Sequence, residues 1–365
     1  MDYSKYKSDF TSAAKESGYN EGEILSFIQY ASTLYDKGLP IIYDQEHLSL
    51  LVGFDYYCCL LPISNWQVDF YKKYEIPKKN GGTRIIEEPY PALKEIQTWI
   101  LKHILEPASL HYVSPVAKAF MPGKNLRENA RFHRKQDLVV ALDLHDFFGS
   151  IKAVSIYQLF RKFGYNKSVS MMLSKLCTLR NSLPQGAPTS PMLSNLIFFE
   201  LDKKIFRYCQ ARNIRYTRYA DDMTFSGDSF SVSHLIAYVK MLVGTRHYTL
   251  NEEKTNVMRK GCCQKVTGVV VNEKIQVSKS YRDKIRQEVY YCIKFGVADH
   301  MRKISLPGWI TTPTIYLHHL LGKVNYVLQI NPKDKVFLEY RKYLCDLLLD
   351  PQIRNYAPNM IQKRK

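Results

Sequence analysis

Three aspartates are the residues of this chain whose type and spacing best suit chemistry. Asp143 lies near the end of the apolar run Leu-Val-Val-Ala-Leu-Asp-Leu at residues 138–144, and Asp221 and Asp222 are consecutive between two β-prone runs. A buried carboxylate is costly unless it is paired or binds a metal, and adjacent carboxylates repel each other unless a cation neutralises them. Three carboxylates that converge on two Mg²⁺ ions could activate a hydroxyl and stabilise phosphoryl transfer. Seen alone, the Asp-Asp pair is more typical of a solvated turn.

The spacing of apolar residues indicates the elements that must position these aspartates. Residues 138–144 are nearly all apolar, which predicts a strand buried on both faces. Residues 214–226 predict two short strands around a tight acidic turn, and residues 155–180 and 191–207 predict helices. The other predicted elements are a helical region at 1–40, a glycine-rich hairpin at 76–86, a helix at 93–105, a strand pair at 265–271 and 274–277, and helices from about 279 onward.

Composition and charge exclude several classes of protein. A chain of 365 residues predicts roughly two or three subdomains. The 45% hydrophobic and 13% aromatic content excludes a disordered chain. The 52 Lys and Arg residues exceed the 34 Asp and Glu residues by 18. This balance favours a polyanionic partner, although other basic proteins share it.

The sequence carries no clear membrane or secretion signal. No run approaches about 18 consecutive apolar residues, and the start Met-Asp-Tyr-Ser-Lys lacks the apolar core of a signal peptide. The eight cysteines include two adjacent pairs but no Cys-x-x-Cys spacing, so we expect reduced, mostly buried thiols and no zinc site. We therefore expect a cytoplasmic protein with no membrane partner.

Five segments, in the same order along the chain, resemble the motifs of reverse transcriptases. Tyr-Ala-Asp-Asp at residues 219–222 resembles the family's signature tetrapeptide, and the segment that begins at Asp143 resembles its motif A. The joint occurrence is specific, whereas each motif alone is weak. The remaining matches are the fingers motif at 78–84, motif B at 183–191 and motif D at 250–255.

Two further motifs resemble those of retron reverse transcriptases and extend the resemblance over roughly residues 35–330. They are Asn-Ala-x-x-His, which begins at Asn129 and ends at His133, and the tripeptide Val266, Thr267 and Gly268. The resemblance implies that these five residues recognise RNA. Without it, Asn129 and His133 would be ordinary capping or core residues of a helix, and the tripeptide would be the end of a strand.

The same resemblance implies a site for the incoming nucleotide. Arg84 and Lys78 would meet the triphosphate, since arginine makes bidentate contacts with phosphate, and Lys254 would protonate the pyrophosphate leaving group. The alternative for each of these three residues is a solvated basic side chain on the surface.

Three further residues complete the nucleotide site that the resemblance implies. Gln185 and Gly186 would let the main chain approach the nucleobase or sugar, and Phe148 would exclude a ribonucleotide by overlap with its 2′-hydroxyl. The alternatives are an ordinary proline-rich loop before a helix and a core aromatic residue.

The fold that the resemblance implies is an α+β right-hand polymerase fold. Its palm would be an antiparallel sheet backed by helices, and its thumb would be helical and basic. The predicted boundaries are 1–88 for an N-terminal helical segment and the fingers, 89–276 for the palm with 116–137 inserted as a fingers or retron-specific region, and 277–365 for the thumb.

The function that the resemblance implies is RNA-directed DNA synthesis in a retron. The enzyme would copy part of a structured non-coding RNA into RNA-linked single-stranded DNA (msDNA), with dNTPs as substrates and an internal guanosine 2′-hydroxyl as primer. Asp143, Asp221 and Asp222 would bind two Mg²⁺ ions. The resemblance also implies a role in defence against phage, with an accessory effector protein as partner.

Three other functions stay open. One is a group II intron-like or abortive-infection reverse transcriptase. Another is an RNA-templated RNA polymerase, against which Phe148 argues. The third is a non-enzymatic RNA-binding scaffold, against which the intact aspartates argue, because clustered carboxylates without a metal would only destabilise the fold.

Overall fold

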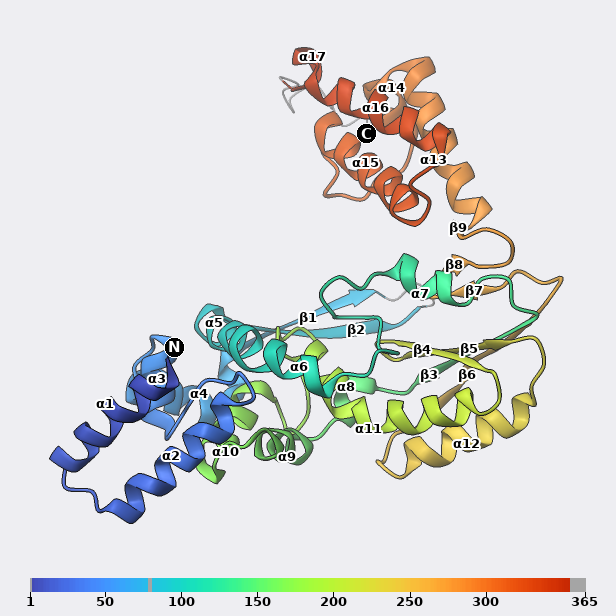
Figure 1. Ribbon diagram of the computed structural model, residues 1–365. Coiled ribbons are helices and arrows are strands. Elements are labelled where there is room, and N and C mark those ends of the chain that lie inside the picture. Colours follow the sequence, from blue (N-terminus) through green and yellow to red (C-terminus); the bar gives the residue numbers. More distant parts are fainter. Residues whose placement is uncertain (1, 78–80, 355–365) are drawn as a thin grey trace. The chain divides into compact units, whose positions relative to one another are not determined.

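The computed structural model describes residues 2–77 and 81–354 and divides the chain into two compact units (Figure 1). The boundaries between the units fall inside strands β3 (Leu138–Leu144), β5 (Asp222–Gly227) and β6 (Leu250–Arg259). They therefore differ from the predicted fingers, palm and thumb boundaries, which stay a prediction. The first unit contains residues up to 123, 142–223 and 231–255, and the second contains residues 124–141, 224–230 and those from 256 onward.

The first unit begins with two helices, which confirms the helical character predicted for residues 1–40. They are α1 (Tyr3–Glu16) and α2 (Glu21–Tyr35). Asn20 starts α2 through a capping box, because its side chain accepts from the Glu23 amide while the Glu23 carboxylate accepts from the Asn20 amide. Four short helical segments follow: α3 (Gln45–Val52), η1 (Tyr56–Leu60), α4 (Leu61–Asn65) and η2 (Gln67–Phe70).

An antiparallel hairpin comes next, as the sequence predicted. It consists of β1 (Tyr71–Pro77) and β2 (Thr83–Pro89), and it is longer than the predicted 76–86 segment. Arg84 lies opposite Ile76 in the register, near the end of the hairpin. Lys78 lies outside the described residues.

The helices of the first unit follow the predicted segments with one correction. The single helix predicted for 155–180 is wrong, because Gly164 adopts a left-handed conformation (φ +115°) that ends α9 (Ala153–Phe163). Asn166 then caps α10 (Lys167–Cys177). The remaining helices are α5 (Pro91–Ile100), η3 (Leu101–Leu105), α6 (Glu106–Tyr112), α8 (Phe147–Ser150), α11 (Ser190–Gln210) and α12 (Val232–Gly244).

A four-stranded sheet has the strand order β4-β5-β3-β6, with β4 at Arg215–Tyr219. Strand β3 confirms the predicted buried strand, because only Ala141 in it is partly exposed. Strand β6 was not predicted, since its residues Leu-Asn-Glu-Glu-Lys-Thr-Asn-Val-Met-Arg show no apolar alternation. It lies at an edge of the sheet, where polar and charged residues are expected.

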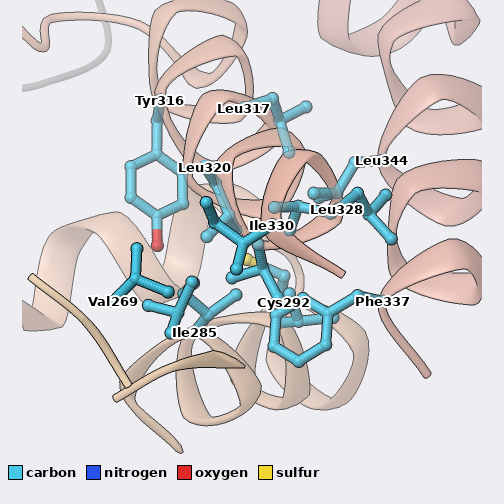
Figure 2. Close-up of a cluster of buried hydrophobic side chains, with 14 of the residues drawn as sticks. Val269, Ile285, Cys292, Tyr316, Leu317, Leu320, Leu328, Ile330, Phe337 and Leu344 are labelled. Carbon is cyan, nitrogen blue, oxygen red and sulfur yellow. The ribbon is translucent and has the colours of Figure 1, made fainter. Parts of the chain in front are cut away.

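The second unit has a helical core, as predicted for the chain from about residue 279. Figure 2 shows its apolar centre, where side chains of α13 (Lys279–Phe295), α15 (Pro313–Ile330) and α16 (Lys335–Leu349) meet. Ile285, Leu317 and Phe337 are among them, and the cluster also includes residues of the small strands. The other elements are α7 (Leu126–Phe132), β7 (Lys265–Val266), β8 (Val269–Val270), β9 (Gln276–Val277), α14 (Val297–Lys303) and α17 (Pro351–Arg354).

Two further predictions concern membranes and thiols. Across residues 2–77 and 81–354, we find no single helix with the length and apolar composition to cross a membrane, although the helix pair Gln45–Val52 and Tyr56–Asn65, bent by 97°, passes the same test. All eight cysteines are free thiols, as predicted, but the prediction that most of them are buried is wrong, because only Cys177, Cys209 and Cys292 are buried.

A buried ion pair joins α11 to β4 directly before the acidic turn. Neither Asp202 nor Arg218 has an exposed side chain, and Arg218 Nη2 lies 2.7 Å from Asp202 Oδ2. Tyr216 donates its hydroxyl to Asp202 Oδ1 at 2.8 Å. Arg218 Nη1 donates to Asn195 Oδ1 at 3.2 Å and to the carbonyl of Ala220 at 3.0 Å. The guanidinium therefore fixes the backbone where β4 ends.

We predict that Asp202→Asn lowers the free energy of unfolding by about 3–5 kcal/mol, because it leaves a buried guanidinium without its counter-charge. Chemical denaturation of the purified protein measures the change. Glu200→Gln, on the same helix, is the control, since Glu200 pairs with Lys162 and Lys203 at half-exposed positions and such pairs contribute little. Equal stability of the two variants would contradict this role of the ion pair.

Candidate active site

A cleft of about 1190 Å³ in the first unit gathers most of the residues that were predicted to bind metal and nucleotide. It is lined by β2, the end of β3, the loop before α11 and the acidic turn after β4. The predicted residues among its lining are Asp143, Asp221, Arg84, Phe148, Gln185 and Lys254. Segments more than 150 residues apart in sequence therefore meet in one hollow.

The backbone brings the predicted carboxylates side by side. The Leu144 amide, next to Asp143, donates to the carbonyl of Asp221 at 3.2 Å. Asp222 follows directly as the first residue of β5. Asp143 is buried, with 6% of its surface exposed, and the other two are half-buried.

Burial and mutual repulsion disfavour the ionised forms of the paired aspartates. Burial raises the pKa of Asp222 to about 6, and the carboxylates of Asp221 and Asp143 act in the same direction. Burial is also the main cause that raises the pKa of Asp221, to which Asp143 contributes as well. Arg84 and Lys254 oppose this rise in the pKa of Asp221. The three carboxylates therefore repel one another, and a cation between them would relieve that repulsion.

Lys254 neutralises Asp143 in this conformation. Its ammonium Nζ donates to both carboxylate oxygens, at 3.0 and 2.9 Å. The hydrogen bond to Asp143 raises the pKa of Lys254, so the lysine keeps its proton. The Lys254 side chain is 58% exposed, which leaves it free to move while Asp143 stays buried.

The chemistry of these residues fits a divalent metal. Carboxylate oxygens are the ligands that Mg²⁺ prefers, and the raised pKa values of Asp221 and Asp222 show that positive charge is favoured beside them. Among the residues that the structure describes, no group of three His, Cys, Asp or Glu side chains could hold an ion as it stands. A metal bound to Asp143 would compete with the Lys254 ammonium for the same carboxylate oxygens.

The acidic turn is held in a strained form by residues that we did not predict. Ala220 has a left-handed backbone (φ +58°), which is costly for a residue other than glycine. The bond from Arg218 to its carbonyl holds it there. One signal could have revealed the partner of Arg218: Asp202 lies on the α11 face that also buries Phe198 and Ile205, and a charge on an apolar face requires a buried counter-charge.

Gly186 lets the loop before α11 approach strand β2. The Gln185 carbonyl accepts from the Glu87 amide at 2.8 Å. A Cβ atom on Gly186 would lie 2.6 Å from the Glu87 carbonyl oxygen, and its φ of +139° also disfavours a side chain. The glycine thus lets two protein segments approach each other, and its approach to a nucleotide stays a prediction. Arg180 also lines the cleft and forms an ion pair with Glu87. The sequence contains no signal that distinguishes this arginine from the others.

The two adjacent phenylalanines after the strand differ in their surroundings. Phe147 is buried and packs against Phe198 with ring centroids 5.4 Å apart. Phe148 is half-buried and lines the cleft, where its ring centroid lies 6.5 Å from that of Phe120. The position of Phe148 suits contact with a bound nucleotide.

The residues predicted to recognise RNA lie together in the second unit, but most are buried. Asn129, His133 and Val266 have no exposed surface, Thr267 is half-buried and Gly268 is exposed. Asn129 Nδ2 donates to Thr267 Oγ1 at 3.4 Å. A role of these residues in RNA recognition stays a prediction. In this conformation the buried side chains of Asn129 and His133 could not contact RNA directly.

Comparison with known proteins gives consistent matches. The family model for reverse transcriptase (RNA-dependent DNA polymerase) matches residues 76–288, which include all three aspartates. The chain is 32% identical over 292 residues to the retron Ec86 reverse transcriptase of Escherichia coli, covering 78% of this chain and 88% of that protein. It is 33% identical over 301 residues to the retron Mx162 reverse transcriptase of Myxococcus xanthus, covering 73% of this chain and 59% of that protein.

We predict that Gly186→Ala destabilises the protein by roughly 1–3 kcal/mol, because the added Cβ overlaps the Glu87 carbonyl and the backbone is strained. Gly244→Ala is the matched control: it lies at the end of α12, its Cβ would meet no atom within 4 Å, and alanine favours a helix. Thermal unfolding compares the two. An unchanged melting temperature for Gly186→Ala would show that the two segments can separate freely.

Proposed function

The chain belongs to the reverse transcriptase family and, within it, to the retron reverse transcriptases, and we propose from this membership and from the cleft which reaction it performs. As a retron reverse transcriptase it is an RNA-directed DNA polymerase with the predicted α+β polymerase fold. The proposed reaction copies part of a structured RNA into DNA that stays linked to the RNA, from the 2′-hydroxyl of an internal guanosine. We also propose a role in phage defence with an effector protein as partner.

The observation that carries the proposal is the meeting of Asp143 and Asp221 with Arg84, Phe148 and Lys254 in one cleft. In the proposed reaction, Asp143, Asp221 and Asp222 hold two Mg²⁺ ions. When bound, these ions would lower the pKa of the attacking hydroxyl and offset the charge of the triphosphate.

The cationic side chains of the cleft have separate proposed roles. Arg84, on β2, donates to the phosphates of the incoming nucleotide, and Lys78, from the same fingers motif, is a second contact. Lys254 holds its proton beside Asp143 in the structure. Once released from Asp143, it can donate that proton to the pyrophosphate oxygen that leaves.

Selection of deoxyribonucleotides is proposed for Phe148. The ring lines the cleft five residues after Asp143 and is supported from behind by buried Phe147, with centroids 5.5 Å apart. A ribose 2′-hydroxyl would overlap the ring. This residue favours DNA synthesis over the alternative of RNA-templated RNA synthesis.

We predict that the double variant Asp221→Asn and Asp222→Asn loses DNA synthesis but keeps its fold and bound RNA. Amides cannot replace two ionised ligands, yet they avoid the burial of charge and the mutual repulsion that raise both carboxyl pKa values. The melting temperature in EDTA should therefore stay equal or rise. Addition of Mg²⁺ should raise the melting temperature of the wild-type protein only.

Sequencing of co-purified nucleic acid provides the functional readout for this variant. The wild-type protein should yield branched RNA–DNA, and the double variant should yield the same RNA without DNA. Loss of RNA binding or a large fall in melting temperature would argue that the aspartates serve the fold, and unbranched wild-type products would reject the proposed priming.

We predict that Phe148→Ala lowers the preference for dNTPs over rNTPs by about 10- to 100-fold, which corresponds to roughly 1.4–2.7 kcal/mol of discrimination. Primer extension with each nucleotide type measures it. Phe206→Ala, at a position of α11 that is 39% exposed and away from the cleft lining, is the control and should keep the wild-type ratio. An unchanged ratio for Phe148→Ala would place the selection elsewhere.

A further inference from the structure

A strained two-residue turn connects β7 to β8 in the second unit. Val266 pairs with Val269, so Thr267 and Gly268 form the turn. Both have positive φ values, +46° and +84°. Turns of this kind strongly favour Asn-Gly, because a β-branched residue is disfavoured in the left-handed region. Gly268 is exposed, and a Cβ on it would meet no atom within 4 Å. Thr267 therefore needs support from its surroundings to stay in this form.

Helix α7 supplies that support through Asn129. The amide Nδ2 of Asn129 donates to Thr267 Oγ1 at 3.4 Å, and the Asn129 side chain is fully buried. Its neighbour Ala130 belongs to the same apolar cluster as Val266 and Val269, which lie on either side of the turn. Figure 2 shows Val269 in this cluster. The helix and the two strands thus share one core, and a polar contact connects them at the turn.

Helix α7 is itself fixed near both ends. His133, at its C-terminal cap, is fully buried, and its Nδ1 lies 2.7 Å from Ser226 Oγ on β5. Near the other end, Arg127 Nε donates to the Ile330 carbonyl at 3.1 Å. Asn129 is therefore held at a defined position from which its amide meets Thr267.

We infer that Asn129 and His133 are positioning residues that hold the Thr267-Gly268 turn in its left-handed form as a preformed contact for RNA, and do not contact the RNA themselves. This inference rests on the proposed function, because it assigns to the turn a contact with the RNA that the enzyme would bind. The exposed Gly268 allows close approach of a nucleic-acid backbone, and a turn fixed before binding loses less conformational entropy on binding.

The main test first removes the Asn129 contact and then replaces Thr267 with a residue that adopts the left-handed conformation without that contact. Asn129→Ala should weaken RNA binding about tenfold. Asn129→Ala combined with Thr267→Asn should restore affinity to within about threefold of wild type, because asparagine adopts the left-handed conformation readily. The probe is the RNA that co-purifies with the wild-type protein, extracted, freed of DNA and labelled.

A matched control separates this effect from general weakening of α7. Asn125→Ala removes the N-cap of the same helix, where Asn125 accepts from the Glu128 amide at 2.9 Å, but it leaves the turn contact in place. Any loss that Asn125→Ala causes should not be restored by Thr267→Asn. Restoration of both variants alike would mean that Thr267→Asn acts by general stabilisation, and would overturn the inference.

Thermal unfolding provides a second readout that does not depend on RNA. Thr267→Asn should raise the melting temperature of Asn129→Ala and should not lower that of the wild-type protein. A lower melting temperature on Thr267→Asn in both backgrounds would overturn the inference. So would an Asn129→Ala variant that loses RNA at an unchanged melting temperature and whose affinity Thr267→Asn does not restore, since that pattern means that Asn129 contacts the RNA directly.

Failure of the proposed function gives a different pattern. Extension of oligo(dT) on poly(rA) by the wild-type protein tests polymerase activity alone. Absence of extension would reject the proposed function, whereas rescue of the melting temperature by Thr267→Asn would still support the positioning role of Asn129. Extension without rescue of either affinity or melting temperature would reject the positioning role only.

Discussion

The buried ion pair between Arg218 and Asp202 is the constraint on which the acidic site depends. An arginine is always charged, so a buried one needs an ionised partner, and it offers five donors in a rigid arrangement. Asp202 takes up three contacts with that guanidinium, and the remaining donors reach Asn195 and the Ala220 carbonyl. The turn can therefore hold Ala220 in a strained conformation that its own sequence does not favour.

Two other cations, Lys254 and Arg84, explain how the site tolerates its negative charge. Burial and neighbouring carboxylates raise the pKa values of Asp221 and Asp222. Lys254 donates a hydrogen bond to Asp143, and Arg84 lies close enough to oppose the rise in the pKa of Asp221. Lys254 and Arg84 thus offset part of the negative charge of the aspartates. Lys254 is more than half exposed whereas Asp143 is buried, so the lysine is the partner of this ion pair that can return to solvent.

The sequence predicted those parts of the fold that depend on local patterns. Strand β3, the hairpin β1–β2, α11 and the acidic turn follow from apolar spacing and turn chemistry. The sequence could not predict β6, because its polar residues suit the edge of a sheet and show no pattern of burial. It could not predict the helix break at Gly164 either, because a glycine inside a helical pattern is equally compatible with a continuous helix. The carboxylates of the cleft were predicted individually, but their ion pairs depend on tertiary contacts between distant segments.

The signature residues of the second unit show why motif and contact must be separated. A motif such as Asn-Ala-x-x-His identifies a family without stating what each side chain contacts. Burial distinguishes the residues here, because Asn129 and His133 lie inside the protein, whereas Gly268, next to the Thr267 that Asn129 contacts, is exposed. A polar side chain that is buried and hydrogen-bonded specifies one arrangement of the backbone around it. In the proposed recognition of RNA, this unit would offer a surface shape that buried residues fix, and exposed lysines and arginines would supply attraction without needing a fixed geometry.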